Sequence, residues 1–288
     1  MATSLIVNPR ASRVHDALID SVAAALGGAT VARTEGPGHA TELAREAQAW
    51  ADAIYVFSGD GGFNEVLNGL DGSVPVGFVP GGGTSVLPRA LGLPRDPLAA
   101  AQRLAVATPR RISLGRANGR RFAFGAGVGL DADAVRRMNA RGRRPDGRRP
   151  GDAFFTWTMA RLLVEGTYAA PLLEVEGEPA CFALAANLAP YSYLGRVPLR
   201  VHPYASAEAG IDLIAPQRFR LRSLPRLAAY VLRGTGQERA ADIVHLHDRD
   251  RIEIRCLRPL PLQVDGEDIG DVESVLLEVE RDAVTVLV

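Results

Sequence analysis

The stretch Val56-Phe-Ser-Gly-Asp-Gly-Gly-Phe-Asn-Glu-Val-Leu-Asn-Gly-Leu70 joins an apolar run to a helical pattern through a glycine-rich turn. Residues 53–57 have the composition of a buried parallel strand, and residues 63–70 have the apolar spacing of a short helix. The turn between them consists of Ser58, Gly59, Asp60, Gly61 and Gly62. Its glycines let backbone N–H groups come close to an anion at the positive end of the helix. The stretch therefore predicts a phosphate-binding turn in an α/β fold.

Asp60 is an unexpected residue in a phosphate-binding turn. Its carboxylate would repel a phosphate unless a divalent cation lay between them, as in phosphoryl transfer. Asp60 is thus the candidate metal ligand, with Mg²⁺ as the ion and a nucleotide as its partner. The alternative is an ordinary Gly-Asp-Gly turn, because glycine-rich turns between strands and helices are common.

A second glycine cluster follows at Pro80-Gly-Gly-Gly-Thr-Ser85, between a strand expected over 74–79 and a helix expected over 86–92. Two more strands are expected at 5–7 and 31–34, and they end near Asn8 and Thr34. In an open α/β sheet, ligands bind at the carboxyl ends of the strands. The two glycine turns, with Asn8 and Thr34, are therefore expected to line one nucleotide crevice. For Asn8, a simple turn-forming role in Asn-Pro is the alternative.

The composition excludes several kinds of binding and catalytic site. The 288 residues contain 33 basic and 33 acidic side chains, so bulk charge attracts no nucleic acid. All the basic residues are arginine, and the sequence contains no lysine. A P-loop lysine, a Schiff-base lysine and a kinase-type lysine are thus excluded. Phosphate contacts must come from backbone amides, hydroxyl groups, arginine or a metal ion.

The sequence also bears on location. Cys181 and Cys256 are far apart and outside any CxxC pattern, which favours neither a disulfide framework nor a zinc cluster and suits a reducing cytoplasm. A signal peptide pattern is missing at the N-terminus, and no run approaches 18 apolar residues. Arg136 to Arg149 is expected to be a mobile basic loop that contacts anionic lipid at the inner membrane face. A solvated loop is the alternative.

Two domains are expected because the pattern of predicted strands and helices changes near residue 113. Residues 1–113 alternate strand and helix, which predicts a parallel sheet with helices on both faces. Residues 114–288 carry short β runs, among them 252–256, 262–264, 275–279 and 284–288, with helices over 152–164 and 224–232, which predicts a β-rich, sandwich-like domain. Asp96-Pro97 predicts the start of a helix, and Asn118-Gly119 predicts a hairpin turn. The overall fold class is therefore α/β followed by β. His245 and His247 lie two apart without a third ligand in view, so a structural role is favoured over metal binding.

The order of motifs resembles the diacylglycerol kinase family of lipid kinases, which also includes sphingosine and ceramide kinases. Ser58-Gly-Asp-Gly-Gly62, followed by Asn64-Glu65, resembles the family's Gly-Gly-Asp-Gly-Thr and Asn-Glu-Val sequences. Three further elements resemble the family's opening Asn-Pro, its Gly-x-Gly-x-Asp-Ala segment and its late Asp-Gly-Glu, namely Asn8-Pro9, Gly127-Val-Gly-Leu-Asp-Ala132 and Asp265-Gly-Glu267. Pro80-Gly-Gly-Gly-Thr84 with Arg89 resembles its second glycine element.

This resemblance implies that MgATP binds in a cleft between the two domains and that a diacylglycerol-like lipid accepts the phosphoryl group. It implies Glu267 as general base, with Asp265 as a positioning or metal-linked partner and Asp60 as the third catalytic residue. Arg89 and Asp131 are implied in substrate binding. The last strands can return to the first domain, and a homodimer is left open. The nucleotide site implied by the motifs consists of Asn8, Thr34, Ser58, Gly59, Asp60, Gly61, Gly62, Asn64, Glu65, Gly81, Gly82, Gly83 and Thr84.

Several positions depart from the family pattern. Gly62 replaces the usual Thr, Gly83 and Ser85 stand where a hydroxyl residue and Asn are common, and Pro88 stands for Ala. These changes remove hydrogen-bond donors from the nucleotide loops and leave weaker or altered nucleotide binding open. Two other functions compete with a lipid kinase. One is an NAD kinase, which shares the Gly-Gly-Asp-Gly turn and the Asn-Glu pair, and the other is a non-catalytic nucleotide- or lipid-binding protein.

Overall fold

The computed structural model describes residues 2–142 and 152–288. The chain divides into two compact units, which are residues 1–114 with 281–288, and residues 115–280. The α/β character predicted for the beginning of the chain and the β-rich character predicted for its remainder are both confirmed.

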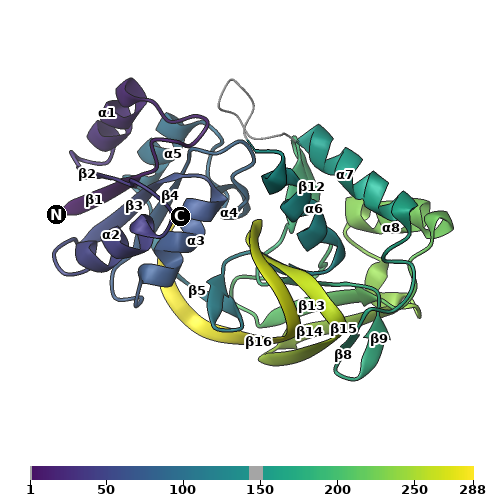
Figure 1. Cartoon of the computed structure of the whole chain (residues 1–288). Coiled ribbons are helices and arrows are strands. Elements are labelled where there is room, and N and C mark those ends of the chain that lie inside the picture. Colours follow the sequence, from purple (N-terminus) through teal and green to yellow (C-terminus); the bar gives the residue numbers. More distant parts are fainter. Residues whose placement is uncertain (1, 143–151) are drawn as a thin grey trace. The chain divides into compact units, whose positions relative to one another are not determined.

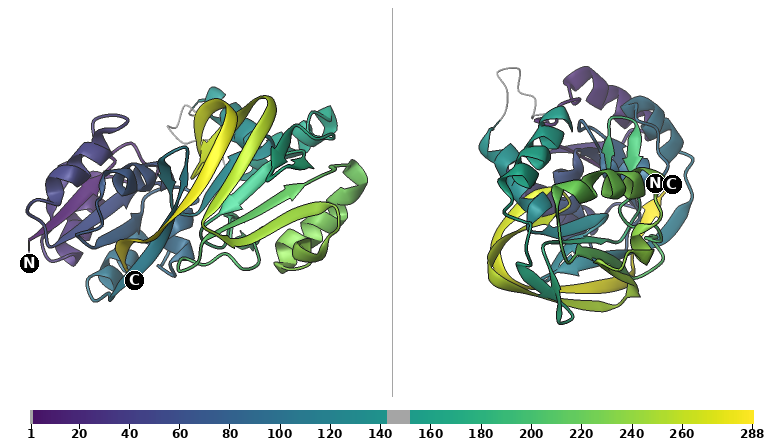
Figure 2. Two further views of the ribbon diagram at one scale, coloured as in Figure 1. Left: turned by 90° about the horizontal axis from the view of Figure 1, so that it is seen from below. Right: turned by 90° about the vertical axis from the view of Figure 1, so that its right-hand side faces the viewer.

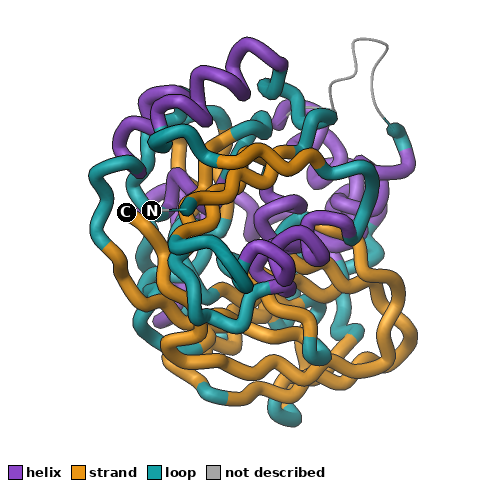
Figure 3. Tube along the Cα trace, turned by 90° about the vertical axis from the view of Figure 1, so that its left-hand side faces the viewer, coloured by secondary structure: helices purple, strands orange, loops and turns teal. Residues whose placement is uncertain are grey.

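The first unit contains a parallel sheet with helices on both faces (Figure 1). Its strands are ordered β2, β1, β3, β4, and its helices pack in two pairs, α1 with α5 and α2 with α3. Figure 3, in which this unit faces the reader, shows the strands between the two groups of helices. The elements in chain order are β1 (Thr3–Val7), α1 (Asp16–Ala25), β2 (Thr30–Arg33), α2 (His39–Ala47), β3 (Ala53–Ser58), α3 (Asp60–Gly69), β4 (Val76–Pro80), α4 (Val86–Ala90) and α5 (Pro97–Leu104).

Successive side chains of each strand point to opposite faces of the sheet, so the core of this unit lies in two layers. Leu5 of β1 and Phe57 of β3 are fully buried in a cluster with Ile19 of α1 and Leu104 of α5. On the opposite face, the ring of Phe63 in α3 meets the ring of Phe78 in β4 edge-on, with centroids 5.2 Å apart. Side chains on both faces are buried because helices cover both faces, as is usual for a parallel sheet.

The C-terminus completes this sheet. The last strand, β16 (Glu267–Leu287), begins in the second unit, and its end lies parallel to β4 with Val286 opposite Val76. Thr108 and Val288 also exchange two backbone hydrogen bonds of 3.0 and 3.2 Å. Strands expected separately at 275–279 and 284–288 are thus one strand.

The second unit is built on an antiparallel sheet ordered β14, β13, β10, β7, β15, β16, with β8 also pairing β15 (Figure 2). Its elements are β5 (Pro109–Ala117), which starts in the first unit, β6 (Arg120–Phe122), β7 (Gly125–Val128), α6 (Leu130–Ala140), α7 (Asp152–Glu165), β8 (Leu173–Val175), β9 (Glu178–Ala180), β10 (Ala183–Ala186), β11 (Ser192–Leu194), β12 (Val197–Leu199), β13 (Ile211–Pro216), η1 (Leu221–Ser223), α8 (Leu224–Arg233), η2 (Gln237–Arg239), β14 (Ile243–Arg249) and β15 (Arg251–Val264).

Three further expectations for local structure are corrected. The helix expected at Phe63 begins at Asp60, so Asp60, Gly61 and Gly62 form its first turn. The strands expected at 252–256 and 262–264 are one strand, β15, whose register shifts between Arg255 and Leu260. Pro259 lies in that irregular segment, where its missing N–H interrupts the ladder without ending the strand.

The third correction concerns the basic segment. Residues 136–140 are helical, as part of α6, where a loop was expected. Arg137 pairs with Asp133 one turn earlier and with Glu165 of α7, which stabilises the helix in this acidic surrounding. Arg143, Arg144, Arg148 and Arg149 lie outside the described residues.

Candidate functional site

Residues that follow four parallel strands meet at one edge of the first unit's sheet. The register places Val7 beside both Arg33 and Phe57, and Ser58 beside Pro80. Asn8 donates its backbone N–H to Phe57 O (3.0 Å), and Thr34 donates its own to Val7 O (2.8 Å). The predicted edge therefore brings Asn8 and Thr34 next to the first glycine turn.

The two glycine turns touch backbone to backbone. A Cβ atom on Gly82 would lie 2.9 Å from Gly59 Cα, closer than real Cβ atoms approach, and one on Gly81 would lie 3.0 Å from Ser58 O. The backbone N–H of Gly81 also donates to Ser58 O (2.6 Å). The glycines thus permit a close approach of two chain segments, and Gly83, next to them, is exposed with open space around it.

Asp60 links the first turn to the element after the second. Its Oδ1 accepts a hydrogen bond from the backbone N–H of Leu87 in α4 (3.2 Å), while the residue itself is half-buried at the start of α3. Leu87 is a neighbour that no local sequence pattern signalled. Among the described residues, no group of three His, Cys, Asp or Glu side chains is arranged to hold a metal ion. Asp60 is the acidic residue of the turn at 58–62, and its carboxylate meets a backbone donor of α4.

The other residues predicted to bind the nucleotide make contacts that hold elements of the first unit together. Glu65 Oε2 accepts the N–H of Ala40 (3.3 Å) in the first turn of α2, so it ties α3 to that helix. Asn64 is fully buried, and its Oδ1 accepts from Asn68 Nδ2 (3.2 Å). Thr84 is half-buried, and its carbonyl oxygen accepts from Arg89 Nη1 (3.4 Å), which folds Arg89 back onto the second glycine turn.

In the second unit, Asp265 and Gly266 form a two-residue hairpin between β15 and β16. Their φ values of 47° and 81° are the left-handed values that such turns require. The Asp265 carboxylate is buried and accepts hydrogen bonds from the backbone N–H groups of Ala123 (2.8 Å), Phe124 (3.0 Å) and Gly125 (3.1 Å). Asp265 therefore fixes the hairpin on the segment before β7.

Glu267 lies directly after this hairpin. Its Oε2 accepts from Arg120 Nη2 at 2.8 Å, and both side chains are about one-third exposed, at 32% and 37%. A guanidinium at this distance stabilises the ionised carboxylate, which is the form a general base needs before it takes a proton. Arg120 was missed in the sequence because it is 147 residues away from its partner.

Asp131 sits at the start of α6 and is buried. Its Oδ2 accepts from Tyr191 OH (2.5 Å) and Gln263 Nε2 (2.9 Å). Burial raises the pKa of Asp131, and the hydrogen bonds from Tyr191 and Gln263 oppose that rise. A Cβ atom at Gly127 would lie 2.1 Å from the Asp131 carboxylate, which explains why the first residue of the Gly-x-Gly-x-Asp pattern is glycine.

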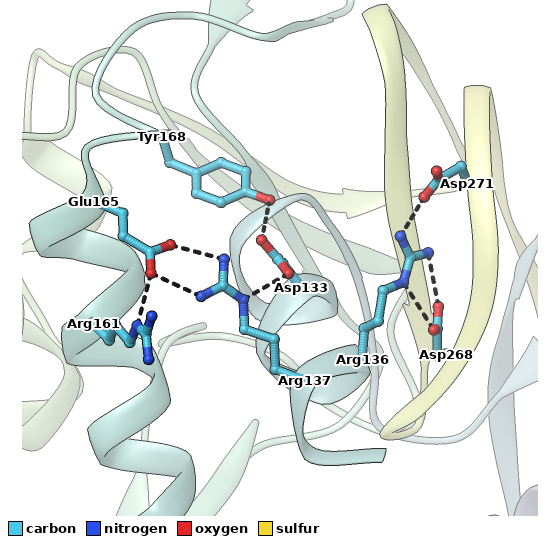
Figure 4. A network of polar contacts seen from close by, with 8 residues as sticks. All are labelled: Asp133, Arg136, Arg137, Arg161, Glu165, Tyr168, Asp268 and Asp271. Carbon is cyan, nitrogen blue, oxygen red and sulfur yellow. Dashed lines mark hydrogen bonds and ion pairs between the residues drawn. The ribbon is translucent and has the colours of Figure 1, made fainter. Parts of the chain in front are cut away.

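Besides the hydrogen bond from Gln263 to Asp131, ion pairs of Arg136 join α6 to the strand that follows the hairpin (Figure 4). Arg136 of α6 binds Asp268 Oδ2 (2.9 Å), next to Glu267, and Asp271 Oδ1 (2.6 Å). On the other side of α6, Arg137 and Arg161 bind Glu165 and lower the pKa of that carboxyl to about 2. Two of the arginines expected to face a membrane are therefore neutralised by acidic side chains.

The comparisons with known proteins agree with the motifs. Residues 3–117 match the family described as the diacylglycerol kinase catalytic domain. The resemblance to the diacylglycerol kinase family is confirmed. A diacylglycerol kinase from Bacillus subtilis (strain 168) is 42% identical over 97 residues, which cover 32% of each chain. The matched segment thus spans about a third of the length of the curated relatives.

Similar solved structures extend the fold over the remainder of the chain. A diacylglycerol kinase from Bacillus anthracis str. Sterne superposes with a TM-score of 0.73 at 19% identity and covers 99% of this chain and 96% of that one. An NAD kinase from Archaeoglobus fulgidus in complex with ATP superposes with a TM-score of 0.53 at 13% identity, covering 99% and 93%. At these identities the likeness shows a common fold.

One departure from the family pattern has a physical explanation. A Cβ atom on Gly62 would lie 2.1 Å from Ser58 Oγ and 2.8 Å from Ser58 Cβ. The side chains at positions 58 and 62 would therefore occupy the same space. The family pattern has Gly at the first of these positions and Thr at the second, so there the Thr side chain fills the space. Here the hydroxyl group comes from Ser58, and position 62 is the glycine.

Proposed function

We propose that the protein is an ATP-dependent lipid kinase that transfers the γ-phosphoryl group of MgATP to the hydroxyl group of a diacylglycerol-like lipid. The observation that supports this most directly is the backbone contact between the two glycine turns, inside the segment that matches the catalytic domain. Close-packed glycine turns at the carboxyl edge of a parallel sheet supply N–H donors for phosphate without any lysine.

For the nucleotide, we assign the phosphates to the turns at 58–62 and 81–84, with Asn8 and Thr34 beside them. Mg²⁺ bound to nucleotide phosphates needs only one or two protein carboxylates, and Asp60 supplies one. The bound ion would neutralise charge on the transferred phosphoryl group. The lack of a three-ligand cluster in the described part of the chain is consistent with an ion that arrives with the nucleotide.

For the acceptor, we assign Glu267 as the general base that takes the proton of the lipid hydroxyl group. Arg120 pairs with this carboxylate, and Asp265 fixes the hairpin that carries it. Asp131, held by Tyr191 and Gln263, and Arg89 are assigned to substrate binding. A lipid hydroxyl group is a poor nucleophile, so a positioned base contributes to the rate.

A lipid substrate requires work at a membrane surface, and no helix of the described residues is long and apolar enough to cross one. Peripheral contact through the arginines of 136–149 remains part of the proposal. Arg136 and Arg137 are engaged by acidic partners, so such contact would depend on Arg141 and on the arginines between 143 and 149.

The test uses γ-labelled ATP with diacylglycerol in mixed micelles and, separately, with NAD. Label in the organic phase with the lipid supports the proposal. Label in a soluble dinucleotide identifies an NAD kinase, and label in neither product, with ATP still bound, identifies a binding protein without turnover. Leaving out Mg²⁺ should abolish labelling in the first case.

A further inference from the structure

The helix α8 is amphipathic, yet none of its residues is buried. Pro225, Ala228 and Leu232 have the i, i+3, i+7 spacing of one helix face, and all three are exposed. Leu232 is 53% exposed, and Leu221 in the preceding turn η1 is 56% exposed. An apolar stripe that the described part of the chain leaves uncovered marks an interaction surface.

Positive charge surrounds this stripe. Residues 217–237 contain five arginines and no acidic residue. Arg226 pairs with Asp242, whereas Arg218, Arg220, Arg222 and Arg233 are exposed and have no ion pair with any described residue. Exposed leucines with unpaired arginines beside them are the combination by which amphipathic helices bind anionic bilayers.

A second helix adds to the same surface. Trp157, Arg161 and Val164 of α7 are exposed at helical spacing, with Trp157 at 52% and Val164 at 74%. The guanidinium of Arg161 lies over the Trp157 ring, 5.6 Å from its centroid. Trp is the side chain most typical of the membrane–water interface.

The two helices are neighbours within the second unit. A small pocket is lined by Leu162 of α7 and Gly166 just beyond that helix, and by Phe219 just before η1 and Leu221 at its start. Figure 1 shows α7 and α8 on the same side of this unit's sheet. We use the name α7–α8 face for their exposed side chains and those of the segment before α8, namely Trp157, Val164, Leu221, Leu232, Arg218, Arg220 and Arg222.

We propose that the α7–α8 face docks on an anionic lipid bilayer. Trp157, Leu221 and Leu232 would enter the interfacial layer while the arginines contact lipid phosphates, their aliphatic stems lying along the apolar surface. Charge decides between this partner and a second copy of the chain. A two-fold contact would place the unpaired arginines of one copy against those of the other, where like charges repel.

This inference extends the proposed kinase function by naming the surface that meets the substrate's membrane. Its test is binding, measured without turnover, so failure of docking and failure of kinase activity can be told apart. It is also independent of the arginines of 136–149.

The first experiment is co-sedimentation with vesicles of phosphatidylcholine, with and without phosphatidylglycerol. The triple variant R218S/R220S/R222S is compared with R45S/R103S/R255S, which removes the same charge from three exposed arginines elsewhere. Each basic side chain near an anionic surface is worth about fivefold in partitioning, so the first variant should bind roughly 100-fold more weakly. The control should bind like the wild type.

The second experiment uses the two tryptophans, of which Trp50 is in the first unit and Trp157 is in the α7–α8 face. In W50F, the remaining Trp157 should be quenched by brominated lipid in anionic vesicles. In W157F, Trp50, which is 47% exposed, should not be.

Three outcomes would overturn the proposal. The first is equal loss of vesicle binding in both triple variants, and the second is unquenched Trp157. The third is a fall in oligomeric state, measured by sedimentation velocity, in R218S/R220S/R222S with unchanged vesicle binding, which would make the face a contact between copies.

Discussion

The shared space between Ser58 and Gly62 makes a quantitative prediction about stability. In Gly62→Ala the new Cβ atom would lie 2.1 Å from Ser58 Oγ, so Ser58 or the start of α3 must move. Overpacking of this kind costs about 1–3 kcal/mol. Ser58→Gly removes both atoms that the new Cβ would meet.

In the Ser58→Gly background, the effect of Gly62→Ala should change sign. Without the clash, alanine in the first turn of α3 should stabilise the fold by about 0.5–1 kcal/mol, through the lower entropy of its unfolded state. The coupling energy of the double-mutant cycle, which is the difference between these two effects, should therefore be about 1.5–4 kcal/mol. Urea denaturation of the four proteins, followed by circular dichroism, measures it.

A control and a refuting result complete this experiment. Gly36→Ala adds a Cβ atom that would meet nothing within 4 Å, and it should change stability by less than about 0.5 kcal/mol in either background. If the cycle gives a coupling energy below about 0.5 kcal/mol, positions 58 and 62 do not compete for one space, and the explanation of the missing threonine is wrong.

Three further predictions concern the site and the second unit. Asp60→Asn should abolish phosphoryl transfer while leaving the circular dichroism spectrum unchanged, and near-normal activity with the same Mg²⁺ dependence would remove Asp60 as the metal ligand. Glu267→Gln should lower the single-turnover rate by roughly 10² to 10⁴ with ATP affinity nearly unchanged, whereas lost ATP binding at an unaltered rate would place Glu267 in the nucleotide site. His202 is buried, and burial lowers its pKa to about 4, below the usual 6.5. Because the unfolded chain then binds more protons than the folded one between these values, His202 should cost stability as the pH falls from about 6.5 to about 4, by on the order of 3 kcal/mol. His202→Gln should flatten that slope in urea denaturation at several pH values, and an unchanged slope in His202→Gln would contradict the assignment.

Local patterns in the sequence predicted local structure well. The Asp96-Pro97 pair predicted a helix start, and Asp96 Oδ1 accepts the N–H of Ala99 at 2.9 Å. Asn118-Gly119 predicted a hairpin turn, and its φ values are 48° and 84°. Both signals depend on residues within four positions of each other, which a single sequence displays directly.

Contacts between distant residues could not be predicted in this way. Tyr191 meets Asp131 across 60 residues, and Arg120 meets Glu267 across 147. Such pairs leave no periodic signal, because they depend on how the strands are ordered in the sheet. The exposure of α8 could not be predicted although its pattern is periodic, because an amphipathic pattern normally indicates a helix with one buried face.

The return of the chain to the first unit has a consequence for biosynthesis. The edge of the first sheet beside β4 is occupied only when residues 281–288 have been made, and all of 115–280 is translated before them. At typical translation rates, the early α/β segment waits roughly 10–30 s with one edge strand unpaired. During that interval β4 is an open template for strand addition by another chain. A ribosome-bound nascent chain stopped at residue 114 should therefore recruit chaperones, and supplying the C-terminal strand in trans should release them.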